Sequence, residues 1–493
     1  MLFNSYLFIF EFVPATILAF FVAAKISRNL ALLALIIASL VFYSGWSGLP
    51  WLVVVSFTFN YLAARLMVWS RARLSKAASR LILPAAISFN LLLLVYYKYT
   101  KFLIYNIDAV AGAHWPIPSI TLPIGISFFT FTQIAFLVDV SRREADEPAF
   151  LRYGLFVTYF PHLLAGPIIH HANVMPQFDK ASIYKFSPHE FGVGLTIFIF
   201  GLFKKVALAD SFSPGVNLAF SGDHTPLIFE AWRGVLAYTL QIYFDFSGYS
   251  DMAIGLSRMF GIELPLNFNS PYKASSIIEF WRRWHMTLSR FLRDYLYISL
   301  GGNRKGRARR YFNLYITMLL GGIWHGAGWT FAIWGALHGL YLILNHAWRH
   351  LLGERTYGIF GRLACHIVTF LAVVAAWVFF RAPSVSVALV ILKGMAGLNN
   401  SPGLSGLLVE PFPKAGFAAI AFGLFVVFTL PNTQQILAAF RPGFSPFDRS
   451  YAHPSGRWHI ARLSPAWGII VGIVFFLALT RMSHVTEFIY YQF

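Results

Sequence analysis

The chain has little charge for its length. Asp, Glu, Lys and Arg make up 12% of its 493 residues, whereas a soluble protein carries about 25%. This shortage argues against an ordinary soluble protein. Apolar runs of roughly 20 residues, the length that crosses a bilayer core, recur along the whole sequence, and they are too long and continuous for barrel strands. We therefore predict an all-α, polytopic integral membrane protein with a single transmembrane domain, residues 1–493.

Cysteine and acidic residues are also scarce. Cys365 is the single cysteine, so no intrachain disulfide can form. Twenty Asp and Glu stand against 39 Lys and Arg, which gives a formal net charge of +19. In a soluble protein this excess would suggest nucleic-acid binding, but in a membrane protein basic residues collect in short cytoplasmic loops and attract anionic headgroups. We expect membrane lipids, and no nucleic acid, as partners.

Several familiar catalytic motifs are missing. The chain has no Gly-x-Ser-x-Gly elbow and no P-loop. No histidine is followed five residues later by aspartate, and no serine or cysteine nucleophile stands at a readable spacing from a base. The histidines inside apolar sequence are therefore the candidates for chemistry.

Hydropathy places fourteen apolar segments along the chain. We expect about 11–14 of them to be membrane segments. All basic clusters, including Arg142/Arg143 and Lys204/Lys205, fall on one side if the N-terminus is outside and every segment crosses, so the positive-inside rule predicts that both termini are periplasmic. The segments lie at 5–24, 29–46, 49–68, 81–98, 122–140, 150–169, 190–209, 226–244, 249–262, 311–323, 329–345, 363–380, 415–431 and 466–481.

Segments 249–262 and 311–323 are short for a span and adjoin polar, glycine-containing sequence. Broken helices persist at membrane depth where they are buried in protein or line a wet cavity, so we expect breaks near Gly248 and Gly326 that form the walls of a site. A further run, 385–397, is too short to cross, and we expect it at the interface.

Residues 265–310 carry ten basic and two acidic residues. Within them, apolar side chains at helical spacing predict an amphipathic helix, interfacial or re-entrant, with tryptophans at headgroup depth. We expect this stretch on the cytoplasmic side. There it is either a surface that attracts phosphate groups or an acidic partner, or a solvated loop. The apolar positions are Phe280, Trp284, Leu288, Phe291 and Tyr295.

Two histidines are the candidate catalytic residues. His325 stands beside Gly326 and Gly328, and an intramembrane ionisable group suggests a functional site; it is either a general base or a histidine hydrogen-bonded between helices. His285 is either its assistant or an interfacial histidine among snorkelling arginines. We expect His338 to be a packing residue.

His162, His170 and His171 are expected to be exposed, at the outer end of segment 150–169. They suggest no metal site, because no carboxylate or cysteine stands at ligand spacing. Asp245 and Asp251 bracket Gly248 and either bind a coupling ion, as in a transporter, or pair with loop arginines. We favour the arginine pairs because an unpaired charge is costly at this depth.

Seven stretches together resemble the membrane-bound O-acyltransferase family, in particular the bacterial branch that serves alginate O-acetylation. The resemblance is densest over about residues 120–380. The stretches are Leu122-Pro-Ile-Gly-Ile-Ser-Phe128, Phe160-Pro-His-Leu-Leu-Ala-Gly-Pro167, Tyr243-Phe-Asp-Phe-Ser-Gly-Tyr-Ser-Asp-Met-Ala253, Glu279-Phe-Trp-Arg-Arg-Trp-His285, Arg293-Asp-Tyr-Leu-Tyr297, Gly301-Gly-Asn-Arg-Lys-Gly306 and Gly322-Ile-Trp-His-Gly-Ala327. The chain departs from the branch at residues 128–133, where a tyrosine is often found, and at His170-His171, where arginine-rich sequence is expected.

The resemblance implies a many-helix core around a funnel or tunnel, with His325 as the essential histidine and His285 as the second polar position. It also implies that an acetyl group passes from a cytoplasmic thioester, acetyl-CoA or an acyl-carrier protein, across the bacterial inner membrane. A periplasmic acetyltransferase and a glycan synthase complex would then complete the O-acetylation of an alginate-like exopolysaccharide. Alternatives are a D-alanyl or lipid-directed acyltransferase of the same family, and a glycan or lipid transporter.

We expect no bound cofactor and no metal. Further residues are expected to contact the donor or the substrate, and Asn303, Arg304 or backbone N–H groups are candidates to stabilise an oxyanion. The expected donor- and substrate-binding residues are Asn303, Arg304, Arg293, Asp294, Trp281, Trp324, Asp245 and Tyr249.

Overall fold

The computed structural model describes residues 1–47, 49–73, 76–112, 114–145, 149–353, 357–399, 414–447, 464–482 and 488–489. These residues are mainly helical, and the β pairing among them is an isolated bridge between Pro265 and Phe444. The first half contains η1 (Phe8–Phe12), α1 (Val13–Ile26), α2 (Arg28–Ser47), α3 (Pro50–Arg73), α4 (Lys76–Leu94), η2 (Val95–Tyr99), α5 (Thr100–Ala111), α6 (Ile126–Arg142), α7 (Phe150–Thr158), α8 (Phe160–Leu163), α9 (His171–Val174), η3 (Met175–Asp179), η4 (Ala181–Tyr184), α10 (Pro188–Phe203), η5 (Lys204–Ala209), α11 (Asp210–Phe220) and α12 (Ile228–Met259). The second half contains η6 (Pro271–Lys273), α13 (Ile277–Trp281), α14 (Met286–Phe291), η7 (Leu292–Tyr297), α15 (Gly306–His325), α16 (Trp329–Leu352), α17 (Ile359–Arg381), α18 (Val385–Met395), α20 (Lys414–Thr429), α21 (Thr433–Ile436), η8 (Ala438–Phe440) and α22 (Pro465–Thr480).

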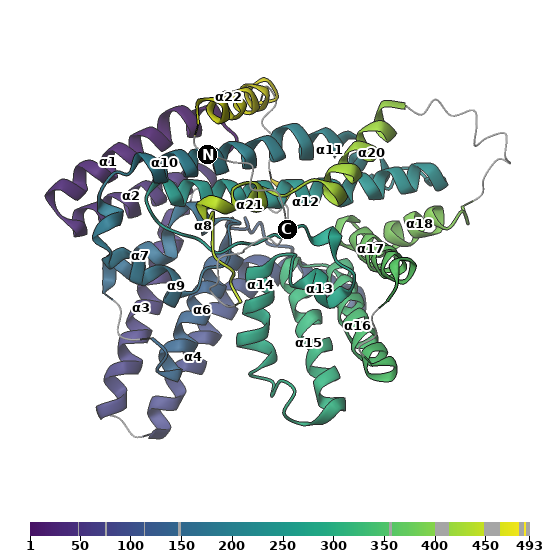
Figure 1. Ribbon diagram of the computed structural model, residues 1–493. Helices are drawn as coiled ribbons and strands as arrows, with labels where there is room; N and C mark the ends of the chain where they lie inside the picture. The colour runs from purple at the N-terminus through teal and green to yellow at the C-terminus, as the bar shows by residue number, and fades with distance from the viewer. Residues whose placement is uncertain are drawn as a thin grey trace.

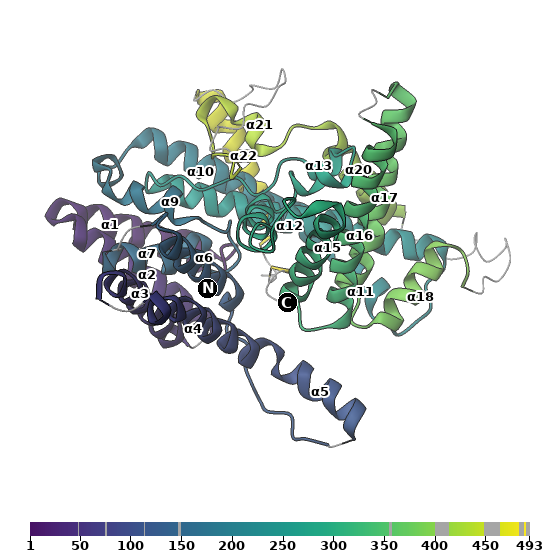
Figure 2. The ribbon, with the colours of Figure 1, turned by 90° about the horizontal axis from the view of Figure 1, so that it is seen from below.

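The helices form two crossing groups. Figure 1 shows α10, α11 and α12 running across the upper part of the molecule, whereas α3, α4, α6, α15 and α16 extend below them. Seen from below, α3 and α4 lie on one side and α15 and α16 on the other, and α5 projects away from the rest (Figure 2). Helix α12 packs against α10, α11, α17 and α20, so it connects much of the molecule.

Six helices of the described residues are long and apolar enough to cross a membrane, which agrees with a polytopic membrane protein. The predicted count of about 11–14 segments and the predicted side of the termini stay predictions. The six are Phe8–Ile26, Arg28–Gly45, Pro50–Arg71, Ser79–Ala111, Pro188–Phe220 and Ile359–Arg381.

The predicted break at Gly248 is wrong. Segments 226–244 and 249–262 form one helix, α12, of 32 residues. Gly248 instead permits close helix packing: a Cβ there would lie 2.8 Å from the carbonyl oxygen of Gly201 on α10. One heptad further on, a Cβ on Gly255 would lie 2.5 Å from the carbonyl oxygen of Gly194. Small residues let two backbones approach in this way, so the glycines mark a helix interface.

Segment 150–169 does not form the predicted span. It contains α7, of nine residues, and α8, of four, and neither is long enough to cross a bilayer core. The chain then returns to α6, as the contact of His170 with that helix shows: Nε2 of His170 lies 3.0 Å from a carboxylate oxygen of Asp139. His170 therefore lies beside the C-terminal end of α6, and the topology in which all fourteen segments cross does not hold.

The predicted amphipathic helix in residues 265–310 is interrupted. It is divided into α13, α14 and η7, and the chain between α13 and α14 turns at His285, which has φ +41°. Trp281 and Trp284 are buried in protein, and their predicted position at headgroup depth stays a prediction. The break arises from tertiary contacts: the amide of Met286 donates to the carbonyl oxygen of Asn267 at 2.9 Å. The predicted break after His325 is confirmed, since Gly326 and Gly328 are extended between α15 and α16.

Candidate active site

His325 is the last residue of α15 and is buried. Three aromatic rings surround its imidazole: the centroids of Trp324, Trp334 and Phe380 lie 4.9, 5.1 and 5.2 Å away. This apolar lining comes from α15, α16 and α17. It limits the motion of the ring and keeps bulk water from most of it.

The close contact between α15 and α16 fixes the position of His325. A Cβ on Gly322 would lie 2.4 Å from the carbonyl oxygen of Phe331 and 2.7 Å from the Cα of Gly335. A Cβ on Gly326 would overlap the ring of Phe331, at 2.1 Å. The glycines around His325 therefore serve close packing of α15 on α16, and this packing holds His325 at the helix end.

His285 lies next to His325, with ring centroids 6.4 Å apart, although 40 residues separate them. It is buried, and Phe246 of α12 packs on it with a centroid distance of 4.8 Å. The interpretation of His285 as an interfacial residue among arginines is therefore wrong. Its left-handed backbone is uncommon for a residue with a side chain, and such conformations occur at functional sites.

Asn267 orients the His285 ring. Its side-chain oxygen receives a hydrogen bond from Nδ1 of His285 at 3.1 Å and from the hydroxyl of Thr287 at 2.9 Å. Because an amide oxygen only accepts, Nδ1 of His285 carries the proton and its lone pair is on Nε2. Sequence reasoning missed Asn267, since it lies in an irregular segment between α12 and α13.

A cavity of about 90 Å³ borders His325. Lys98 and Trp324 line it, together with residues 122–128 at the start of α6. The sequence analysis singled out that stretch for its resemblance but gave it no role, and it missed Lys98, which lies within a predicted apolar segment. An intramembrane lysine is itself a signal that could have been used.

Trp281 and Trp324 lie close to the histidines and make different contacts, a hydrogen bond and a ring stack. The indole N–H of Trp281 donates to Nδ1 of His338 at 3.3 Å. His338 is fully buried among aromatic rings, which agrees with the packing role predicted for it. Trp324 stacks on Phe131 of α6, with ring centroids 4.8 Å apart, and so joins α15 to α6 beside the cavity.

Asn303 and Arg304 lie too far from His325 to stabilise an oxyanion there. They precede α15, whose 20 residues end at His325, and at 1.5 Å per residue that helix is about 30 Å long. Both side chains are exposed. Arg293 is also half-exposed and pairs with Asp294 at 2.7 Å. Any role of Asn303 and Arg304 is therefore confined to a surface remote from His325.

The predicted pairing of Asp245 and Asp251 with loop arginines is wrong. Asp245 lies 2.8 Å from the ammonium of Lys205, and Asp251 lies 2.6 Å from that of Lys204. The π-helical segment η5 presents both lysines to α12, so the two charges taken as a positive-inside cluster are buried ion-pair partners. Tyr249 is buried between the rings of Phe3 and Phe488, at 4.8 Å from each. The structure thus gives Asp245 and Tyr249 packing partners within the protein.

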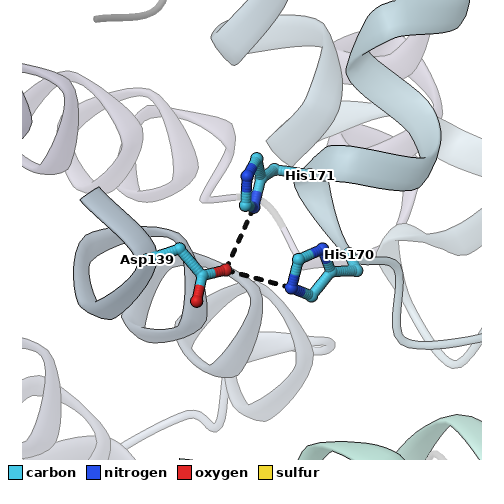
Figure 3. A group of neighbouring side chains, drawn as sticks. All are labelled: Asp139, His170 and His171. Carbon is cyan, nitrogen blue, oxygen red and sulfur yellow. Dashed lines mark ion pairs between the residues drawn. The ribbon is translucent and has the colours of Figure 1, made fainter. Parts of the chain in front are cut away.

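His162, His170 and His171 were expected to be exposed, but His162 and His171 are buried and His170 is partly buried. Figure 3 shows His170 and His171 directed at one oxygen of Asp139. The distances to it are 3.0 Å from Nε2 of His170 and 3.1 Å from Nδ1 of His171, and the Tyr295 hydroxyl donates to it at 2.6 Å. Asp139 is the carboxylate that the sequence analysis did not find.

Asp139, His170 and His171 are of the residue types that bind metal ions, and their donor atoms lie within 4.8 Å of one another. The hydrogen bonds disfavour a metal ion here: Nδ1 of His170 accepts from the amide of Ala172 at 3.3 Å, so the proton is on Nε2. A metal-binding histidine instead points a lone pair at the ion and donates with its other nitrogen. The bonds of His171 differ, because its Nε2 faces the carbonyl oxygen of Glu144 at 3.4 Å and donates to it. We interpret His170 and Tyr295 as the donors that stabilise the buried Asp139 carboxylate.

Glu279 supports the turn that leads to His285. Burial opposes its ionisation, but hydrogen bonds from the Ser275 amide and hydroxyl and the adjacent Arg283 charge outweigh burial, so its pKa lies below the ordinary value. The guanidinium of Arg283 donates to it at 2.7 Å. Arg283 therefore belongs to an ion pair that fixes the end of α13.

The part of the chain that holds both histidines resembles a known protein family. Residues 38–391 match the sequence profile of the membrane-bound O-acyltransferase family, which covers well over half of the chain. The chain belongs to that family. It is thus a multi-pass membrane O-acyltransferase, and the predicted resemblance and enzyme class are confirmed.

The curated relatives include enzymes with different named acceptors. The chain is 42% identical to the peptidoglycan O-acetyltransferase of Helicobacter pylori, over 81% of this chain and 80% of that protein. It is 40% identical to the probable alginate O-acetylase AlgI of Pseudomonas aeruginosa, over 86% and 82% of the two chains. A teichoic acid D-alanyltransferase of Streptococcus thermophilus is 26% identical over 46% of this chain and 57% of its own.

Proposed function

We propose that this acyltransferase passes an acetyl group from a cytoplasmic thioester across the bacterial inner membrane for O-acetylation of an extracytoplasmic polysaccharide. The observation that carries the proposal is the pair of buried histidines, 6.4 Å apart, of which His325 borders a cavity. Relatives named as O-acetyltransferases for alginate and for peptidoglycan support acetyl as the acyl group.

In the proposed reaction, His325 is the general base. A hydroxyl of the acceptor gives its proton to the imidazole while its oxygen attacks the thioester carbonyl carbon. The resulting tetrahedral oxyanion collapses, the C–S bond breaks, and the thiolate leaving group takes up the proton from His325. A base held in this way contributes about 10²–10⁴-fold to the rate, and His285, oriented by Asn267, assists by binding the acceptor or the oxyanion.

The donor is acetyl-CoA or an acetylated carrier protein, and we propose that it approaches the exposed basic surface formed by Arg304, Lys305 and Arg307. That surface can attract phosphates or an acidic carrier. No bound metal or cofactor is required by the proposed steps. A periplasmic acetyltransferase and a glycan synthase complex are the proposed partners that deliver the acetyl group to an alginate-like exopolysaccharide.

The test uses purified protein in lipid nanodiscs with radiolabelled acetyl-CoA, and cells in which the acetyl content of the exported glycan is measured. His325→Ala is expected to lower acetyl transfer by at least about 10²-fold, and His285→Ala by less. His366→Ala alters a partly buried histidine of α17 that precedes Phe380, the residue of this helix at the site, by fourteen residues, or about 21 Å of helix. It is the matched control and should leave the rate unchanged. Full glycan acetylation in His325→Ala cells would refute the base assignment.

A transporter is the weaker alternative, because the two carboxylates proposed as its ion sites are paired with Lys204 and Lys205. Normal glycan export together with lost acetylation in His325→Ala cells would exclude it. A D-alanyltransferase remains the alternative within the family. It would be recognised by transfer of labelled D-alanine, and not acetate, from a carrier protein.

A further inference from the structure

Lys98 contacts the polypeptide end that carries His325. Its ammonium donates to the carbonyl oxygen of Trp324 at 2.6 Å and to that of His325 at 2.9 Å. The neighbouring Tyr99 hydroxyl donates to the carbonyl oxygen of Ile323 at 2.8 Å. Two consecutive side chains therefore bind three consecutive carbonyl groups of the last turn of α15.

These bonds meet a need created by the helix break. The last carbonyl groups of a helix have no partner within it, and Gly326, which follows His325, is extended and does not continue the helix. Carbonyl groups left without donors would be costly at membrane depth. A cation is also the favoured group at a helix C-terminus, because the helix dipole is negative there.

The backbone that presents Lys98 is itself unusual. Lys98 belongs to η2, a π-helical segment between α4 and α5. Segments of this kind are uncommon and often occur at functional sites. The ammonium lies 3.4 Å from the hydroxyl of Ser127 on α6, so a single side chain joins three elements that line the cavity beside His325.

We propose that Lys98 is a positioning residue for acyl transfer: by binding the Trp324 and His325 carbonyl groups, it fixes the last turn of α15 so that the His325 ring keeps its orientation toward the cavity. This inference rests on the proposed function of His325. Misplacement of a reacting group by about 1 Å can cost about 10²-fold in rate, so loss of these bonds affects turnover more than binding of the donor.

The test compares Lys98→Met with Lys98→Arg and Lys101→Met in nanodiscs. Methionine keeps the length of the side chain but has no donor, arginine keeps donors, and Lys101 is an exposed lysine of α5 one turn further on. Lys98→Met is expected to lower kcat by about 10²-fold with a change in donor KM of less than about threefold. Lys98→Arg should recover a substantial part of kcat, and Lys101→Met should equal the unsubstituted protein.

Hydrogen exchange of a peptide that contains residues 323–328 gives a readout that needs no acyl chemistry. In Lys98→Met this peptide should exchange about tenfold faster, as expected when the hydrogen bonds of a helix end are lost, while peptides of α10 keep their rates. Unchanged exchange in Lys98→Met would overturn the positioning role, whatever the activity. If exchange accelerates but the unsubstituted protein transfers no acetyl group, Lys98 still holds the end of α15, but the proposed function fails and the role of Lys98 in acyl transfer fails with it.

Discussion

At the residue scale, side chains that are remote in sequence fix the tautomer of one histidine and the backbone position of the other. His285 obtains its tautomer from Asn267, 18 residues earlier, and His325 obtains its backbone position from Lys98, 227 residues earlier. The sequence could indicate both histidines, because an imidazole in apolar sequence is unusual. It could not indicate Asn267, whose importance depends on contacts that no local spacing encodes. Lys98 could have been noticed as a lysine within an apolar segment, but its partners on α15 could not have been predicted.

Replacement of Asn267 by alanine tests the orientation of His285. It removes the acceptor for His285 Nδ1 and for the Thr287 hydroxyl, and each buried donor left unsatisfied costs about 1–3 kcal/mol. We expect acetyl transfer to fall by about 10–100-fold, since a rate effect of this size corresponds to about 1.4–2.7 kcal/mol.

Thr287→Ser is the matched control for Asn267→Ala. Serine keeps the hydroxyl that donates to Asn267 and accepts from the amide of Ile168, so activity should stay near that of the unsubstituted protein. Both variants are measured in the labelled acetyl-CoA assay. Equal activity of Asn267→Ala and Thr287→Ser would show that the ring of His285 needs no such support.

At the element scale, glycines and π-helical segments decide where the polar groups lie. Glycines let α15 approach α16, and α10 approach α12, more closely than any side chain would permit. Three π-helical segments then deliver Lys98, Lys205 and Tyr295 to buried partners. Hydropathy located most of these helices, but Gly248 was misread as a break, because glycine favours both a break and a close helix contact and only the presence of α10 distinguishes the two.

Gly322→Ala tests the contact between α15 and α16. The added methyl group would lie 2.4 Å from the backbone oxygen of Phe331, which cannot rotate away as a side chain could. Overpacking of this kind costs about 1–3 kcal/mol, so the thermal unfolding midpoint in detergent should fall, and acetyl transfer should fall with it because His325 ends the same helix.

Gly472→Ala is the control for Gly322→Ala. Gly472 is also within an apolar helix, α22, but a Cβ there would meet no atom within 4 Å. Its unfolding midpoint should match or slightly exceed that of the unsubstituted protein, since alanine favours helix more than glycine does. Identical midpoints for the two glycine variants would mean that α15 and α16 can separate freely.

At the scale of the whole molecule, buried charges connect segments from distant parts of the chain. The lysines of η5 pair with Asp245 and Asp251 of α12, and these carboxylates also accept from the amide of Ile489 and from the side chain of Gln434. The sequence analysis predicted that these carboxylates have partners, but it assigned them to arginines that are near in sequence. The partners came instead from the helix that packs beside α12.

Lys205→Met tests whether these charges stabilise the fold or serve transport or substrate binding. The substitution leaves Asp245 buried with an uncompensated charge, and loss of one partner of a buried pair costs about 3–5 kcal/mol. We expect a large drop in the unfolding midpoint. The double variant Lys205→Met/Asp245→Leu removes both charges of this pair and should regain much of that loss, because replacing a buried pair by apolar residues is often nearly neutral. Asp210, which also pairs with Lys205 at 2.7 Å, is partly exposed and stays in contact with solvent.

Acetyl transfer by the double variant decides between the two roles of Asp245. A structural role predicts that the double variant keeps most of its activity once its stability is recovered, whereas a substrate- or ion-binding carboxylate predicts a stable but inactive protein. Lys180→Met, which alters an exposed lysine, controls for the change in net charge. Asp245 is buried on α12 and pairs with Lys205 of η5. We therefore expect the structural outcome, which leaves His325 and His285 as the groups that carry the chemistry.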